Sequence, residues 1–142
     1  MTNPYEQYLE NTVLTATPLE LVRMLYDCAI EAVGQARSCL AEGDIAGRAR
    51  PVTRAFDAIT ELVLSLDHEK GGAISKNLAD LYTYMQQRLL LGHCTQADEH
   101  YAEVERLLTS MAECWSQIAS ATPPPAPMPV ETPQAYSYAA GF

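Results

Sequence analysis

The chain has 142 residues, and its 18 acidic and 9 basic side chains give a formal net charge of −9 at pH 7. Nucleic acids and anionic membranes attract proteins largely through Lys and Arg, so this charge argues against both kinds of partner. A chain of this length can bury roughly 70% of its unfolded surface, so it needs neither a metal nor a disulfide to fold.

The start of the chain and the cysteines indicate a cytoplasmic protein. The opening Met-Thr-Asn-Pro lacks the cationic start and apolar core of a secretory signal. No apolar run approaches the roughly 20 residues that span a bilayer, so we expect no membrane insertion. The four cysteines form no Cys-x-x-Cys pair, so we expect reduced, buried thiols and no cofactor.

The first predicted helix covers residues 17–40 and follows a lead that contains Tyr5 and Tyr8. Thr17, with proline next and Glu20 three positions on, is a capping box with Pro at the first helical position. Apolar residues then recur at spacings of three and four, which is typical of a helix with one buried face. Gly43 and Asp44 supply a stop signal and a new N-cap.

A second helix is predicted over residues 45–66, although Pro51 falls inside it. Because proline lacks an N–H and clashes one turn back, we expect a kink or a delayed helix start there. Residues 67–72 form the next turn.

The third helix is predicted over residues 73–91 and should end at Gly92. Thr95 and Asp98 then form a weaker capping box for a fourth helix that reaches about residue 120. Each of the four helices is expected to place one stripe of apolar residues in the core. The stripes are Val22, Tyr26, Ala29, Val33, Ala36 and Leu40; Val52, Phe56, Ile59, Val63 and Leu66; Ile74, Leu78, Leu81, Met85 and Leu89; and Tyr101, Val104, Leu108, Met111, Trp115 and Ile118.

The last segment, residues 121–142, changes character, since six of the nine prolines lie in residues 122–142 beside one acidic residue. Such a composition cannot build a core, so we expect a disordered or polyproline-like tail. The chain therefore divides into an N-terminal segment (1–16), a helical domain (17–120) and the tail. Four helices with short links predict an all-α, antiparallel, up-down four-helix bundle.

The helices carry more apolar residues than one core stripe needs. At about 100° per residue, Met24, Leu64, Leu90 and Leu91 fall well away from their stripes. Exposed apolar patches of this kind usually mark an interface. Leu21 and Leu62 have a second interpretation, in which they widen the core stripe.

Few residues suggest chemistry, so we expect a binding protein and not an enzyme. The histidines lack the Glu-x-x-His spacing of di-iron bundles. His93, Cys94 and His100 could meet near one end of the bundle, but polar residues at helix ends are the simpler interpretation. An alternative function is a histidine-phosphotransfer-like signalling module, because His68 precedes Lys70 and Gly71. A generic helical adaptor is a further alternative.

Several short motifs in register resemble one known family. They are Asn3-Pro4-Tyr5-x-x-Tyr8, Val13-x-Thr15-Ala16-Thr17-Pro18-x-x-Leu21, Met24-Leu25-Tyr26-Asp27, Glu42-Gly43-Asp44-Ile45, Ser65-Leu66-Asp67, Glu69-Lys70-Gly71-Gly72, Leu78-x-x-Leu81-Tyr82-x-Tyr84-Met85, Arg88-Leu89, Glu103-Val104 and Trp115. Together they are similar to the flagellar secretion chaperone family, the flagellin-specific export chaperones. The resemblance spans about residues 3–118.

The resemblance implies a four-helix bundle that binds the disordered C-terminal segment of flagellin in the cytosol. It also implies that premature polymerisation is blocked and that flagellin stays competent for flagellar type III secretion. The client would wrap around the bundle as helices in apolar grooves. The flagellar export apparatus, and a second copy of the chain when no client is bound, are further candidate partners.

The resemblance also suggests which residues contact the client. The candidates are Tyr5, Tyr8, Leu21, Met24, Leu25, Leu62, Leu64, Leu66, Tyr82, Met85, Arg88 and Leu89. Tyr5 and Tyr8 would belong to an N-terminal lid or pack on the bundle. Met85, Leu89 and Trp115 also suit the core, and Arg88 could bind a client carboxylate or an acidic residue of its own chain.

Overall fold

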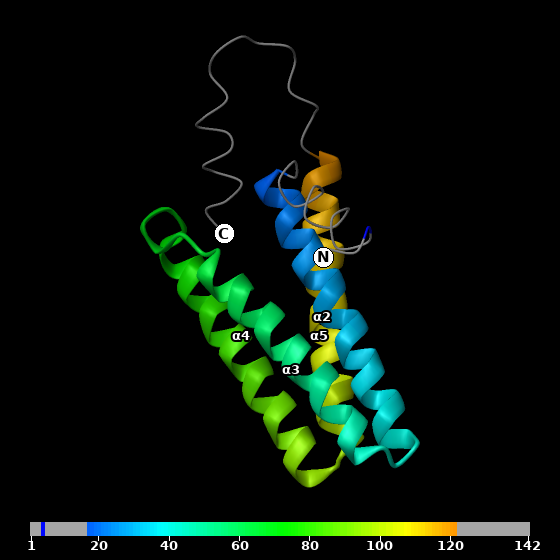
Figure 1. The fold of residues 1–142 in the computed structure, drawn as a ribbon. Coiled ribbons are helices and arrows are strands. Elements are labelled where there is room, and N and C mark those ends of the chain that lie inside the picture. The colour runs from blue at the N-terminus through cyan, green and yellow to red at the C-terminus, as the bar shows by residue number, and fades with distance from the viewer. Residues whose placement is uncertain (1–3, 5–16, 122–142) are drawn as a thin grey trace.

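The computed structural model describes residue 4 and residues 17–121, with side chains up to residue 118. Over these residues the chain is all-helical and forms four long helices (Figure 1). They are α2 (Pro18–Ala41), α3 (Ile45–Leu64), α4 (His68–Thr95) and α5 (Asp98–Ala121). None of the described helices is both long enough and apolar enough to cross a membrane. Tyr5, Tyr8 and almost all of the predicted tail lie outside the described residues.

The beginning of α2 is the predicted capping box. The Glu20 N–H donates to Thr17 Oγ1 at 3.2 Å, and the Thr17 N–H donates to Glu20 Oε2 at 3.0 Å. Pro18 occupies the first helical position, where its missing N–H removes no intrahelical bond. After the helix ends, Gly43 takes a φ of +72°, which glycine adopts without steric cost.

Helix α3 begins at Ile45, as the sequence predicted, so of the two outcomes expected at Pro51, a kink or a delayed start, the delayed start is wrong. Asp44 caps the helix, since its Oδ1 accepts from the Gly47 N–H at 2.8 Å. Pro51 would have bonded the Gly47 carbonyl, and Gly47 lies at the exposed surface, where water can satisfy that oxygen. The proline ring itself is buried and contributes to packing.

The sequence predicted that the third helix ends at Gly92, but α4 continues past this residue. Gly92 is buried inside the helix, and a Cβ there would lie 2.9 Å from Cε1 of Tyr101. This glycine therefore lets α4 approach α5 closely, and α4 continues to Thr95. The break lies earlier in the helix, at Gly72, whose φ of 52° and ψ of −123° are not helical.

The second predicted capping box is also wrong. The Thr95 hydroxyl donates to the Leu91 carbonyl at 2.7 Å, one turn back in its own helix. Thr95 is the last residue of α4, and among the described residues its hydroxyl accepts no hydrogen bond from the start of α5. Gln96 is the C-cap of α4, with a φ of 55°. Asp98 and Glu99 lie in the first turn of α5, where acidic side chains interact favourably with the helix dipole.

The helices pack in a closed ring, because α2 contacts α3 and α5, and α4 contacts the same two helices (Figure 1). The core between them contains most of the predicted stripes, with Tyr26, Ile59, Met85 and Leu108 among its fully buried members. Ile74 was expected in the core but is 54% exposed, whereas the adjacent Ser75 is fully buried. Ile118, near the end of α5, is also exposed against expectation.

The cysteines are less buried than expected. Cys28 and Cys39 are half-buried, whereas Cys94 and Cys114 are exposed. Cys114 precedes Trp115, which is buried, so the helical turn carries the cysteine to the outside of α5.

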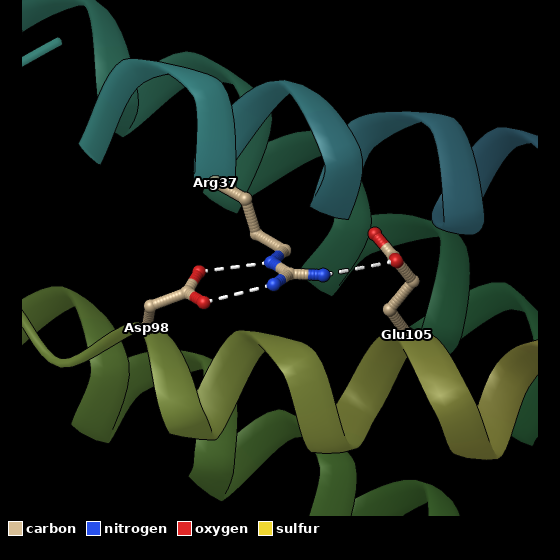
Figure 2. A network of polar contacts seen from close by, with 3 residues as sticks. All are labelled: Arg37, Asp98 and Glu105. Carbon is tan, nitrogen blue, oxygen red and sulfur yellow. Dashed lines mark hydrogen bonds and ion pairs between the residues drawn. The ribbon is translucent and has the colours of Figure 1, made fainter. Parts of the chain in front are cut away.

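Two polar networks tie the first helix to the others. In the core, the Trp115 indole N–H donates to the Tyr26 hydroxyl at 3.1 Å, and that hydroxyl lies 2.5 Å from the Tyr82 hydroxyl. At the surface, Arg37 on α2 reaches two carboxylates of α5 (Figure 2). Its Nε and Nη2 donate to Asp98 at 2.8 and 2.9 Å, and its Nη1 donates to Glu105 at 3.1 Å.

A buried arginine links α3 to the end of α4. Arg48 is only 2% exposed, and its Nη2 donates to the carbonyl of His93 at 3.0 Å. Its Nε donates to Nδ1 of the same histidine at 3.2 Å. A cation at a helix C-terminus stabilises the unpaired carbonyls there, which gives this buried charge a structural role.

Candidate client-binding surface

Helix α3 has two outer sides of different character. The side toward α4 carries no charged residue and consists of Ile45, Ala49, Thr53, Phe56, Thr60 and Val63. Its direction is fixed by Gln86 of α4, whose Nε2 donates to the Phe56 carbonyl at 3.1 Å and to Thr60 Oγ1 at 2.8 Å. The side toward α2 carries charges at every turn: Arg50, Arg54, Asp57 and Glu61.

Helix α4 shows the same division. Ala79, Thr83, Gln86 and Leu90 share the side that borders α3. The opposite side borders α5 and is polar, since Tyr84 and Arg88 both bond to Glu103 there.

The two uncharged strips meet along the outside of the α3–α4 pair, and we call them together the neutral face. Charged residues make up 19% of the chain, yet none of the ten residues of this face is Asp, Glu, Lys or Arg. Phe56 and Val63 are half-buried, and Ile45 and Leu90 are 55% and 49% exposed. An amphipathic helix laid along this face could bury its apolar side against these ten uncharged residues, and the charged Lys76 and Asp57 lie at the borders of the face.

Five of the predicted client contacts lie in the core. They are Leu62, Leu66, Tyr82, Met85 and Leu89, all at most 9% exposed. The resemblance suggested these residues as client contacts, although Leu66, Met85 and Leu89 also belong to the predicted core stripes, and the packing of the helices encloses all five. In this conformation they offer a client no surface, so their contact with a client stays an untested prediction that burial does not favour.

The other described candidates remain partly accessible. Leu21, Met24 and Leu25 are half-buried on the first two turns of α2. Leu64 is 71% exposed at the end of α3. These four residues keep the accessibility that a client contact requires.

Arg88 is engaged within its own chain. Its Nη2 donates to Glu103 Oε2 at 3.1 Å, and the Tyr84 hydroxyl also donates to that carboxylate. The hydrogen bond from Tyr84, together with the charge of Arg88, lowers the pKa of Glu103. Of the two interpretations that the sequence left open for Arg88, the intramolecular ion pair is the one observed.

Sequence reasoning did not recognise the neutral face. It placed Phe56 in the core, noted Leu90 only as surplus, and gave Thr60 and Gln86 no role. The available signal was the absence of charge on one side of each helix, which appears only when the two sides of α3 and α4 are compared separately.

The histidines form no recognisable catalytic group. His68 begins α4 at an exposed position and does not lie in the middle of a helix, where a phosphotransfer histidine would stand. Nδ1 of His93 accepts from Arg48, and His100 is buried on α5. Within the side chains that the structure describes, no group of three or more His, Cys, Asp or Glu residues could hold a metal ion.

The described helices form a closed bundle that leaves an uncharged, partly apolar face open, an arrangement that suits a protein-binding module. The sequence model described as "Flagellar protein FliS" matches residues 1–122, so the chain belongs to the FliS family of flagellar secretion chaperones. This confirms the family that its short motifs suggested.

Relatives from several bacteria share this similarity. The flagellar secretion chaperone FliS of Salmonella typhimurium is 39% identical over 112 residues, which cover 78% of this chain and 83% of that protein. The Bacillus subtilis protein of the same name is 30% identical over 115 residues, covering 81% and 85%. The Escherichia coli protein is 30% identical over 118 residues, covering 82% and 87%.

Proposed function

We propose that this chain is a cytosolic export chaperone that binds the C-terminal segment of flagellin. Binding would prevent premature polymerisation and keep flagellin competent for flagellar type III secretion. Family membership supports the chaperone role, and the resemblance of the motifs to flagellin-specific chaperones supports this client. The proposed role is binding and not catalysis.

The neutral face is the observation that carries the proposal. A helical segment of flagellin would lie along it with apolar side chains against Phe56 and Leu90. Because the client orders on binding, affinity per unit area would be modest and the contact would be wide. A wide contact suits a client that wraps around a bundle.

Other parts of the chain would extend this contact. We take the helices to alternate up and down, since links of two or three residues join them. Leu21, Met24, Leu25 and Leu64 would then add apolar surface beyond the neutral face. The segment 1–16, with Tyr5 and Tyr8, would act as a lid, and the export apparatus would receive the complex.

Two neighbouring leucines provide a matched test. Leu90 lies on the neutral face, and Leu91 lies on the side of α4 that borders α5, with 49% and 42% of their surfaces exposed. Titration of the chain with a peptide of the flagellin C-terminal segment should show binding and a gain of helical circular dichroism. Leu90→Asp should weaken binding by about tenfold or more, because a charge would be desolvated under the client.

Leu91→Asp is the control, with the same change in charge and side-chain size, and it should leave the affinity within about twofold. Thermal melts of both variants should match the unmodified chain, since both positions are exposed. If the flagellin peptide gives neither heat nor a helical signal with the unmodified chain, the proposed client is wrong. If both variants weaken binding equally, the client is not seated on the neutral face.

A further inference from the structure

The last residues of the chain differ from the proline-rich stretch that precedes them. All six prolines of the tail lie in residues 122–133, whereas residues 134–142 contain none. This second stretch, with the sequence Gln-Ala-Tyr-Ser-Tyr-Ala-Ala-Gly-Phe, carries three aromatic side chains and no charged one. We call residues 134–142 the aromatic segment. The family match ends at residue 122, so family membership gives this segment no role.

The neutral face presents a surface of matching character. Leu90 is 49% exposed and Phe56 is half-buried, so both leave apolar surface in contact with water. Burial of this surface under aromatic rings is favourable, and a tyrosine can keep its hydroxyl in water while its ring is buried. Neither the face nor the aromatic segment contributes a charged side chain, although the chain has a net charge of −9. Their contact therefore avoids the cost of burying a charge, and the exposed Lys76 and Asp57 stay in water at the borders of the face.

The proline-rich stretch is long enough to bring the aromatic segment onto the neutral face. Figure 1 shows the last turn of α5 at the same end of the bundle as the start of α2 and the link between α3 and α4. At about 3.1 Å per residue, residues 122–133 span up to roughly 37 Å in a polyproline conformation. Helix α3, with 20 residues, is only about 30 Å long. The aromatic segment can therefore reach Phe56 and Leu90, which lie within that length.

We propose that the aromatic segment docks on the neutral face of its own chain, with Tyr138 and Phe142 against Phe56 and Leu90. The tether favours this contact, because a short linker gives an effective concentration on the order of 1 mM. A contact with a dissociation constant of about 0.1–1 mM is weak between separate molecules. Within one chain it is formed in about half to nine-tenths of the molecules.

Docking makes the aromatic segment a competitor of the client, a step that rests on the proposed function. Flagellin must displace the segment before it binds, so its apparent affinity is lowered by about twofold to tenfold at the occupancies given above. A chaperone without a client keeps part of its apolar surface covered, which opposes self-association. The docking of the segment does not itself depend on which client the chain binds.

Methyl NMR of the full chain, labelled at the leucine methyl groups, tests the docking without any client. The ring currents of docked Tyr138 and Phe142 shift the methyl signals of Leu90. The variant Tyr138→Ser/Phe142→Ser should therefore move the Leu90 signals and leave those of Leu91, on the side of α4 that borders α5, in place. Met128→Ser/Val130→Ser is the control, because it removes two apolar side chains from the proline-rich stretch and should move neither leucine.

Three results of this experiment would overturn the inference. Leu90 signals that ignore Tyr138→Ser/Phe142→Ser would show that the aromatic segment is not on the neutral face. Equal movement in the control variant would show that residues 134–142 are not the docking segment. Movement that disappears on dilution would show that the segment docks on a second copy and not on its own chain.

Calorimetry with the flagellin peptide then tests the competition. Tyr138→Ser/Phe142→Ser should bind the peptide about twofold to tenfold more tightly than the unmodified chain, and equal affinities would refute the competition. If neither protein binds the peptide while the Leu90 signals respond to the variant, the proposed client is wrong and the docking stands. If the peptide binds and the Leu90 signals do not respond, the docking is wrong and the client stands.

Discussion

The hydrogen bonds of Tyr26 yield a sharp prediction about stability. Its hydroxyl accepts from the Trp115 indole at 3.1 Å and lies 2.5 Å from the Tyr82 hydroxyl, and both tyrosines are at most 1% exposed. Tyr26→Phe removes the group at the centre of this network. Tyr82→Phe removes a group at its edge and leaves the bond between Tyr26 and Trp115 in place.

The magnitudes follow from the number of bonds lost. A buried hydrogen bond contributes about 0.5–1.5 kcal/mol net, and an orphaned buried hydroxyl costs about 1–3 kcal/mol. Tyr26→Phe, which loses two bonds and leaves the Tyr82 hydroxyl without its partner, should lower the free energy of unfolding by about 2–3 kcal/mol. Tyr82→Phe should lower it by about 1 kcal/mol. The double variant should be no less stable than Tyr26→Phe, because the orphaned Tyr82 hydroxyl is then gone as well.

Urea unfolding followed by circular dichroism gives the free energy of unfolding of the unmodified chain, the two single variants and the double variant. At about 3–5 °C for each kcal/mol, Tyr26→Phe should also melt roughly 6–15 °C below the unmodified chain. If Tyr82→Phe is as damaging as Tyr26→Phe, or if the two losses simply add in the double variant, the central place of Tyr26 in the network is wrong.

Three further predictions concern the core and the ionisable groups. Leu62→Ala should cost about 2–5 kcal/mol in urea unfolding, whereas Leu64→Ala should cost less than about 0.5 kcal/mol; equal costs would contradict the burial of Leu62. Hydrogen bonding to Arg37 lowers the pKa of Asp98, so this contribution to stability is present above about pH 4 and is lost as the pH falls through the lowered pKa. Arg37→Gln should therefore lose up to about 1 kcal/mol at pH 7, and its difference from the unmodified chain should shrink as the pH falls below about 4; a constant difference would refute the linkage. Burial raises the pKa of Tyr82, so stability that is full below about pH 10 should fall as the pH rises further. Tyr82→Phe should make this alkaline loss shallower in urea unfolding, and an unchanged loss would contradict the assignment.

Local signals predicted most of the fold. The capping box at Thr17 and the apolar periodicity placed α2 within one residue of its observed end. The delayed start considered at Pro51 and the helix end predicted at Gly92 are both wrong for a shared reason, because both residues were interpreted from their own backbone preferences. Pro51 is tolerated because the affected carbonyl is exposed, and Gly92 is required because α5 approaches it. Both reasons depend on tertiary neighbours.

The candidate site was harder to predict than the fold. An angle around a helix separates the core from the opposite side, but it does not show how far neighbouring helices enclose the intermediate positions. Leu62, which the angle left between core and surface, and Met85, which the resemblance suggested as a contact, are both fully buried. The neutral face depends on which side of α3 meets which side of α4, and only the contacts of Gln86 establish this register.

The closed ring of helices has a consequence for synthesis on the ribosome. The first helix contributes Tyr26 and Arg37, but Trp115 and Asp98, which complete their networks, belong to the last helix. While α5 is still inside the exit tunnel, the α2–α3–α4 segment exposes the apolar side that α5 will cover. The nascent chaperone is thus itself an aggregation-prone chain, and it gains its native core only when nearly all of its helical domain has emerged.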